Sequence, residues 1–466
     1  MSAPATVAEL CSWTGGDIIR GRGEQAFTGS VIDSRAATKG DLFVAIVGPN
    51  HDAHRFVANV LEGGAAGALV QRDRVPQTPI VGDAFLVCVD DTTEALAGLA
   101  AGHRRAFDGP LIGITGSNGK TTTKELCAGI LNGCGPTLAT RGNLNNNFGV
   151  PLTLLRREAS DRYAVVEMGM NHRGEIAGLA AIAEPTIGVL TNVGTAHIEF
   201  LGSRETIAEE KGDLLAAIPA SGIAIVGRDD ALAFAQARRT SARVLSFGQS
   251  SGADLKASAL RFLDEGAYAF RLETPFGAGE IRVAGLAETI VENALAAAGG
   301  AFAADASFDQ VAEGLAQHAG VPGRMQPRAF LNDLLVIDDT YNANPQSMQS
   351  ALETLSRLPA NGARYAVLGP MGELGDAADE AHATLGRLAA ELKLDGLFLL
   401  GDADAPAAQA ARDAGLAQNQ VISESNHEAL ANALQTTLSK GDRVLVKGSR
   451  AARMERVIEL LEEAGH

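Results

Sequence analysis

Cysteine is scarce in this chain of 466 residues, which contains four, with no C-x-x-C pair and no dense spacing. A disulfide framework of the kind that stabilises small secreted domains is therefore excluded. We expect free, mostly buried thiols in a reducing compartment at Cys11, Cys88, Cys127 and Cys134.

Long apolar runs are also absent, and the 39 Lys and Arg residues are outnumbered by 56 Asp and Glu residues. No run of about 18 apolar residues occurs, and the N-terminal stretch MSAPATVAELCSW has neither a basic start nor an apolar segment of signal-peptide length. The formal net charge is -17, and such a field repels polyanions, which argues against nucleic acid and anionic membranes as partners. We therefore expect a soluble, cytoplasmic protein without membrane insertion.

Aromatic residues make up only 5% of the chain, whereas apolar residues of all kinds make up 46%. The cores should therefore be aliphatic, as is typical of α/β enzymes with buried parallel sheets. At roughly 150 residues per domain, this length predicts about three domains.

The distribution of strand and helix patterns divides the chain at two places. Residues 1–109 read as a small α/β domain, residues 110–320 as a central parallel-sheet domain with an antiparallel insertion after Leu255, and residues 321–466 as a Rossmann-like doubly wound domain with four parallel strands. The segment HAGVPGRMQP, rich in Gly and Pro, marks the second boundary.

The segment GITGSNGKTTTKEL, residues 113–126, lies between an apolar strand and a helix that should begin at Lys120. Small residues let backbone amides turn toward a phosphate, and the helix N-terminus adds partial positive charge. Lys120 would reach the β- and γ-phosphates, and Thr121 would offer its hydroxyl to Mg²⁺. Ile114 occupies the place of the first glycine in the strict pattern, so a Gly-rich turn that only caps a helix is the alternative.

Further polar residues follow other predicted strands. Glu167, at the end of VVEMGM, suits Mg²⁺, although it could also be a solvated strand end. Asp339, at the end of LLVIDD, could accept from ribose hydroxyls or cap the next helix. Lys447 and Arg450, in VLVKGSRAARME, could bind a substrate carboxylate or a neighbouring acidic surface.

In combination, these motifs resemble the Mur ligases, the ATP-dependent amide-forming enzymes of peptidoglycan precursor synthesis. The resemblance rests on TGSNGKT, GNLNNN, VVEMGM, TNVGTAH, VPGRM, DDTYNANP and VLVKGSR, and it covers residues from about 33 to 454. The segments DDTYNANP and VLVKGSR are most similar to the members that add D-alanyl-D-alanine to UDP-N-acetylmuramoyl-tripeptide. The N-terminal segment VIDSRAATKGDLF resembles the uridine-binding domain that the last two ligases share.

The resemblance implies an ATP-dependent peptide ligase that works through an acyl phosphate, with two Mg²⁺ sites and a carbamylated Lys211. From composition alone, Lys211 would be a solvated surface lysine, and His197 a structural loop histidine. The residues that the resemblance implies fall into four groups: for catalysis Lys120, His197, Lys211 and Arg324; for ATP Thr115, Gly116, Ser117, Asn118, Gly119, Lys120, Thr121, Thr122, Asn293, Arg324 and Asp339; for the other substrates Ser34, Arg35, Asn146, Asn147, Asn344, Lys447, Ser449 and Arg450; and for metal Thr121, Glu167, His197 and Lys211.

The sequence also departs from the family. Thr289 and Ile290 stand where the family usually has His-Asn, and Pro370 and Gly372 stand in LGPMGELG where an acidic or bulkier residue is frequent. Three alternatives remain: the sister ligase that adds the third amino acid, a folylpolyglutamate synthetase-like ligase, and a non-catalytic nucleotide-binding regulator. We expect a monomer whose third domain swings inward about Val321 to Arg324.

Overall fold

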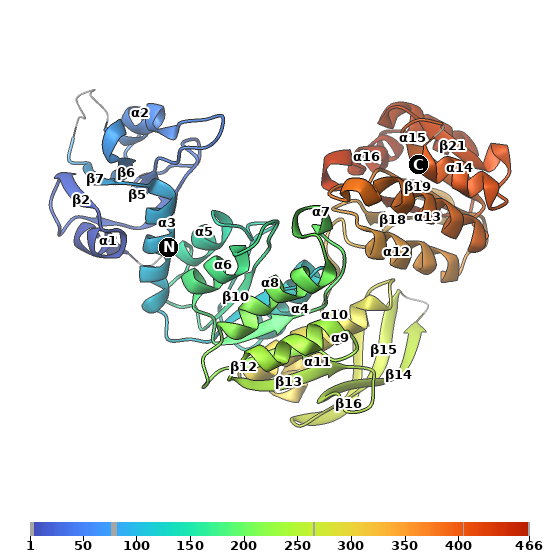
Figure 1. Ribbon diagram of the computed structural model, residues 1–466, viewed down its shortest axis with the longest axis horizontal. Coiled ribbons are helices and arrows are strands. Elements are labelled where there is room, and N and C mark those ends of the chain that lie inside the picture. Colours follow the sequence, from blue (N-terminus) through green and yellow to red (C-terminus); the bar gives the residue numbers. More distant parts are fainter. Residues whose placement is uncertain (1–3, 76–81, 264–265, 404, 465–466) are drawn as a thin grey trace.

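The computed structural model describes residues 4–75, 82–263, 266–403 and 405–464. Three α/β domains follow one another along the chain, and the N-terminal and C-terminal domains lie on either side of the central one (Figure 1). In the described residues, no helix has both the length and the apolar character needed to cross a membrane.

The N-terminal domain is built on a five-stranded sheet in the order β2-β7-β6-β5-β4, in which only β2 runs antiparallel to its neighbour. A second, two-stranded sheet joins β1 and β3. The elements are β1 (Ala5–Thr6), α1 (Val7–Thr14), β2 (Asp17–Arg20), β3 (Ala26–Phe27), β4 (Gly29–Val31), β5 (Asp41–Val44), α2 (Val57–Glu62), β6 (Gly67–Gln71), β7 (Phe85–Val89) and α3 (Thr92–Arg105).

The central domain contains a nine-stranded sheet in the order β16-β15-β14-β13-β12-β11-β8-β10-β9. Strands β8 to β14 run parallel to one another. Strands β15 and β16 are added antiparallel beyond β14, and they are the hairpin expected from the sequence. The strands are β8 (Leu111–Thr115), β9 (Thr137–Ala139), β10 (Tyr163–Glu167), β11 (Ile187–Leu190), β12 (Ile223–Gly227), β13 (Arg243–Gly248), β14 (Leu255–Leu263), β15 (Ala267–Thr274) and β16 (Gly277–Ala284).

Helices cover both faces of the central sheet, because successive residues of its buried strands point to opposite sides. Val166 of β10 belongs to one hydrophobic cluster, whereas its neighbour Val165 belongs to the other. The helices are α4 (Lys120–Asn132), α5 (Gly149–Leu155), α6 (Glu175–Ala183), α7 (Ile198–Leu201), α8 (Arg204–Ala216), α9 (Ala231–Ala235), α10 (Thr289–Ala303) and α11 (Phe308–Ala316).

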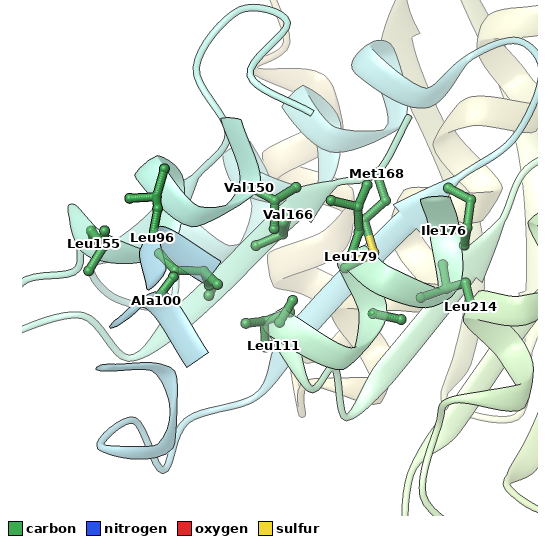
Figure 2. Packing of buried hydrophobic residues seen from close by; sticks show 14 of the residues in the cluster. Leu96, Ala100, Leu111, Val150, Leu155, Val166, Met168, Ile176, Leu179 and Leu214 are labelled. Carbon is green, nitrogen blue, oxygen red and sulfur yellow. The ribbon is translucent and has the colours of Figure 1, made fainter. Parts of the chain in front are cut away.

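Helix α3 joins the N-terminal and central domains through a shared core. Figure 2 shows Leu96 and Ala100 of α3 beside Val150 and Leu155 of α5, and all four are buried in one cluster. The buried Arg104 of α3 also donates hydrogen bonds to the carbonyl oxygens at the end of α6, at 2.8 Å to Ala183 and 3.0 Å to Glu184. These two domains therefore pack as one unit.

The C-terminal domain has a six-stranded sheet in the order β17-β18-β22-β19-β20-β21, two strands more than the sequence predicted. The additional strands are β17, which runs antiparallel to β18, and the parallel edge strand β21. The elements are β17 (Gln326–Ala329), β18 (Leu335–Asp339), α12 (Pro345–Arg357), β19 (Arg364–Leu368), α13 (Ala378–Glu391), β20 (Gly396–Leu400), α14 (Pro406–Asp413), β21 (Val421–Glu424), α15 (His427–Thr437), β22 (Arg443–Lys447) and α16 (Glu455–Glu463).

The cysteines are all free, with Cys88 and Cys127 buried and Cys11 and Cys134 partly buried. Burial raises the pKa of the Cys127 thiol to about 12.

Candidate active site

The predicted loop connects β8 to α4, and α4 begins at Lys120 as expected. Ile114 is fully buried within β8, so the chain stays extended where the strict pattern would place a glycine, and the turn begins only at Gly116. Gly119 has a φ of 79°, which favours glycine. A Cβ at Gly119 would overlap the Oδ1 atom of Asn293, and one at Gly116 would overlap the Oγ1 atom of Thr191.

Residues after the adjacent strand β11 hold this loop in place. The amide of Asn118 donates to Asn192 Oδ1 at 2.9 Å, and Thr191 Oγ1 donates to the carbonyl oxygen of Asn118 at 2.7 Å. The amide of Gly194 donates to Ser117 Oγ at 2.7 Å. Sequence reasoning did not single out Thr191 and Asn192, although both belong to the quoted TNVGTAH segment.

Lys120 lies over the loop. Its ammonium group donates to the carbonyl oxygens of Gly116, at 2.8 Å, and Ser117, at 3.3 Å. Desolvation lowers the pKa of Lys120, and the nearby Glu167 carboxylate opposes that shift. The arrangement presents a cation and backbone amides on one side of the site, which suits a phosphate chain.

Glu167 ends strand β10 beside this loop and is 2% exposed. Its Oε1 atom accepts from Asn145 Nδ2 at 2.8 Å, whereas Oε2 is buried and accepts no hydrogen bond within the described ranges. A buried carboxylate oxygen without a donor fits a cation ligand. Even so, the described residues include no cluster of three or more His, Cys, Asp or Glu side chains arranged to bind a metal ion.

Lys211 lies on α8 and is 1% exposed, so it is not a solvated surface lysine. Desolvation and the nearby charge of Lys120 hold the pKa of Lys211 well below its usual value. In the part of the chain that the structure describes, its ammonium group makes neither a hydrogen bond nor an ion pair.

The C-terminal domain reaches the loop with three side chains. Arg324 Nη2 donates to Thr121 Oγ1 at 2.9 Å, and its guanidinium carbon lies 3.9 Å from the centre of the Tyr341 ring. Asn344 Nδ2 donates to Asn118 Oδ1 at 2.7 Å, and Asn118 Nδ2 donates to Gln346 Oε1 at 3.3 Å. The phosphate loop of the central domain therefore lies directly against side chains of the C-terminal domain.

Asp339 and Lys447 form a buried ion pair behind these side chains. Lys447 Nζ lies 2.6 Å from Asp339 Oδ2 and donates to the carbonyl oxygen of Asn342 at 2.9 Å, while Asp339 Oδ1 accepts from the amide of Met325 at 3.0 Å. Asp339 is not a helix cap, because Asn344 is the N-cap of α12.

A cavity of about 690 Å³ unites most of the predicted site residues. Among the residues that line it are Ser117, Asn118, Gly119, Lys120, Thr121, Thr122, Glu167, His197, Asn293, Arg324, Asp339, Asn344 and Lys447. Thr289 and Ile290 line it as well, as do Asn143 and Asn145 of the segment GNLNNN.

Other predicted residues lie outside the cavity lining. Asn146 and Asn147 are exposed, and Asn146 Oδ1 accepts from the amide of Gly149 at 2.9 Å. Gly116 and Thr115 lie beneath the loop, where Thr115 Oγ1 donates to the carbonyl oxygen of Met168 at 2.9 Å. Ser449 is buried after β22.

Two predicted arginines are exposed and paired with acids. Arg450 Nη1 lies 2.9 Å from Glu455 Oε1. Arg35, whose side chain is 88% exposed, pairs with Asp33 in the N-terminal domain, close to the half-buried Ser34. The hydrogen bond from Arg35 lowers the pKa of Asp33 to about 2.

A phosphate loop in a central parallel sheet, faced by a Rossmann-like third domain, defines a class of three-domain α/β enzymes that act on nucleotides. Residues 114–301 match the Mur ligase middle domain, and residues 323–450 match the Mur ligase, glutamate ligase domain. The UDP-N-acetylmuramoyl-tripeptide–D-alanyl-D-alanine ligase of Escherichia coli (strain K12) is 36% identical over 438 residues, which cover 93% of this chain and 93% of that protein.

Solved structures agree with the sequence comparison. A crystal structure of MurF from Acinetobacter baumannii matches with a TM-score of 0.89 at 36% identity and covers 99% of each chain. The MurF ligase from Thermotoga maritima in complex with ADP matches with a TM-score of 0.81 at 32% identity, over 93% of this chain and 97% of that one. The chain belongs to the Mur ligase family.

Proposed function

We propose that this enzyme uses ATP to join D-alanyl-D-alanine to UDP-N-acetylmuramoyl-tripeptide in peptidoglycan precursor synthesis. The observation that carries the proposal is the phosphate loop, to which Asn344 of the C-terminal domain bonds directly, and its helix, to which Arg324 bonds through Thr121. The printed names of full-length relatives support the choice of substrates, and the ADP complex of the Thermotoga maritima relative supports the use of ATP.

Amide formation from a carboxylate needs an activated acyl group. The terminal carboxylate of the tripeptide would attack the γ-phosphorus of ATP, which releases ADP and leaves an acyl phosphate. The amine of D-alanyl-D-alanine would then attack the acyl carbon, expel inorganic phosphate and lose a proton. Both steps depend on the position of the reactants and on neutralisation of phosphoryl charge. Lys120, the amides of the phosphate loop and Arg324 supply that charge.

The donor set fits a divalent cation. Thr121 and Glu167, whose Oε2 atom accepts no hydrogen bond within the described residues, would hold one Mg²⁺, while His197 and a carbamylated Lys211 would hold a second. When bound, Mg²⁺ neutralises charge on the phosphoryl oxygens. The burial of Lys211 and its lowered pKa support carbamylation, because the neutral amine is the nucleophile toward CO₂.

We assign binding of the UDP-sugar to residues 1–109, where Ser34 and Arg35 would lie near it. ATP would bind to residues 110–320, and the dipeptide to residues 321–466. Asn293 and Asp339 would bind the nucleoside, and Asn146 and Asn147 the muramoyl peptide. For the dipeptide, we retain Asn344, Lys447, Ser449 and Arg450. Lys447 is paired with Asp339, and Arg450 with Glu455. The carboxylate of the dipeptide must therefore displace one of these acids or bind to neighbouring groups. We further propose a cytoplasmic monomer.

A phosphate-release assay tests the substrates. All reactions contain the enzyme, ATP and Mg²⁺. Two reactions contain a UDP-N-acetylmuramoyl-tripeptide, one with D-alanyl-D-alanine and one with D-alanine alone. Further reactions contain a UDP-N-acetylmuramoyl-dipeptide with diaminopimelate or lysine, or a folate with glutamate. Release only with tripeptide and D-alanyl-D-alanine supports the proposal. Release with the dipeptide or the folate would identify a sister activity, and nucleotide binding without any release would indicate a regulator.

A further inference from the structure

The loop between β19 and α13 presents one carboxylate toward the central domain. Met371 and Leu374 anchor this loop in the hydrophobic core of the C-terminal domain, and the amide of Met371 donates to His382 Nε2 at 3.0 Å. Between the anchors lies Glu373, with its side chain 45% exposed and a φ of 61°. A left-handed backbone at a non-glycine residue costs of order 1–3 kcal/mol and persists where the surroundings enforce it.

The partner of this carboxylate is His197 of the central domain. Glu373 Oε2 lies 2.6 Å from His197 Nδ1, although the ring N–H does not point in line with the oxygen. His197 also has a left-handed backbone, with a φ of 65°, and it precedes the short helix α7. Next to this contact, a Cβ at Gly375 would lie 3.4 Å from Cγ of Glu199 in α7, so the two segments approach closely there. Two strained residues of different domains therefore meet at one point.

This contact differs from the hydrogen bonds between the two domains, which accompany the burial of Leu286 of the central domain in the core of the C-terminal domain. Arg324, Asn344 and Gln346 all bond to the phosphate loop or its helix, where ATP would compete for the same atoms. The pair of His197 and Glu373 includes no atom of that loop. It can therefore persist while nucleotide is bound.

We propose that Glu373 is a positioning residue that holds the imidazole ring of His197 and so fastens the C-terminal domain onto the central domain. A carboxylate beside Nδ1 favours the ring tautomer that carries its proton on that nitrogen, which leaves the lone pair on Nε2. The consequence for turnover rests on the proposed function, whereas the contact between the domains does not.

Hydrogen exchange of the full chain without substrates tests the contact alone. Glu373→Gln keeps the shape of the side chain and removes its charge. Exchange should rise several-fold in both residues 196–202 and residues 370–377, in the variant relative to the wild type. Asp379→Asn, which removes an equal charge at the start of α13, should leave both segments unchanged.

Steady-state kinetics tests the positioning role. In Glu373→Gln, kcat should fall about 10-fold, in the range for residues that orient a ligating histidine, while the Kd of a non-hydrolysable ATP analogue stays at the wild-type value. Glu373→Asp, which keeps the charge, should retain an intermediate kcat. Wild-type exchange and wild-type kcat in Glu373→Gln would overturn the proposal, as would an equal loss of ATP-analogue affinity. An inactive wild-type enzyme with D-alanyl-D-alanine would instead contradict the proposed function and leave the exchange result valid.

Discussion

Gly119, the N-cap of α4, and Gly129, within α4, differ in the space available for the methyl group of an alanine. At Gly119, a Cβ would overlap the Oδ1 atom of Asn293, and the φ of 79° disfavours alanine; at Gly129, no atom lies within 4 Å. Gly119→Ala should therefore destabilise the fold by about 1–3 kcal/mol and weaken binding of an ATP analogue. Gly129→Ala should stabilise the helix by about 0.5–1 kcal/mol and leave binding unchanged. Chemical denaturation and nucleotide titration measure the two effects, and equal behaviour of both variants would contradict the structure.

Lys120 provides the principal test of the phosphate site. Its ammonium group already lies over the loop carbonyls, so it is placed to meet phosphoryl oxygens. Lys120→Ala should lower kcat by about 100-fold or more, the usual cost of losing one preorganised charge-stabilising group. Phosphate release in the complete reaction measures this loss. The exposed Lys440→Ala is the control, and native turnover in Lys120→Ala would refute the assignment.

The phosphate loop could be predicted from sequence because the loop, its strand and its helix are continuous in the chain. The residues that brace it could not, since Thr191 and Asn192 are distant in sequence and meet it only through the sheet order, whereas Asn293 was expected only from the family resemblance. For the segment GNLNNN, the sequence predicted asparagines near the substrate but not where each asparagine side chain lies. Asn145 bonds to Glu167, whereas Asn146 accepts from the amides of Phe148 and Gly149, a difference that local pattern does not encode.

Helix α3 offers a test at the level of single elements. Leu96 is fully buried in the core that α3 shares with α5, and Figure 2 shows it beside Leu155. Leu96→Ala should lower the free energy of unfolding by about 2–5 kcal/mol. It should also shift the unfolding of the N-terminal and central domains together, as seen in a denaturant titration followed by tyrosine and tryptophan fluorescence. The control Leu331→Ala, at a site that is 66% exposed, should change stability little.

The apolar strands β8, β10 and β12 were predictable because both of their faces are buried. In the C-terminal domain, the two strands that sequence analysis missed, β17 and β21, lie at the two edges of the sheet. Strand β17 contains Pro327 and two polar residues, which is tolerated at a sheet edge where no second partner needs the missing N–H group. Strand β21 has one buried residue, Val421, followed by three partly buried ones, so its pattern does not stand out.

The whole molecule should change shape when it binds its substrates. Residues 317–325 connect α11 to β17 and include Gly320 and Gly323, with φ values of 87° and 69°. Beside the contacts of Leu286 and His197 with the C-terminal domain, the hydrogen bonds of that domain to the phosphate loop lie where ATP would replace them, so ligands that bridge the two domains should change their spacing. Small-angle scattering should show a smaller radius of gyration with an ATP analogue, UDP-N-acetylmuramoyl-tripeptide and D-alanyl-D-alanine together than with none of them. Lys120→Ala should show no such compaction with the same mixture, because it cannot hold the triphosphate that Arg324 would meet. A wild-type profile that stays constant through the titration would mean that the domains are already fixed and that residues 317–325 are not a hinge.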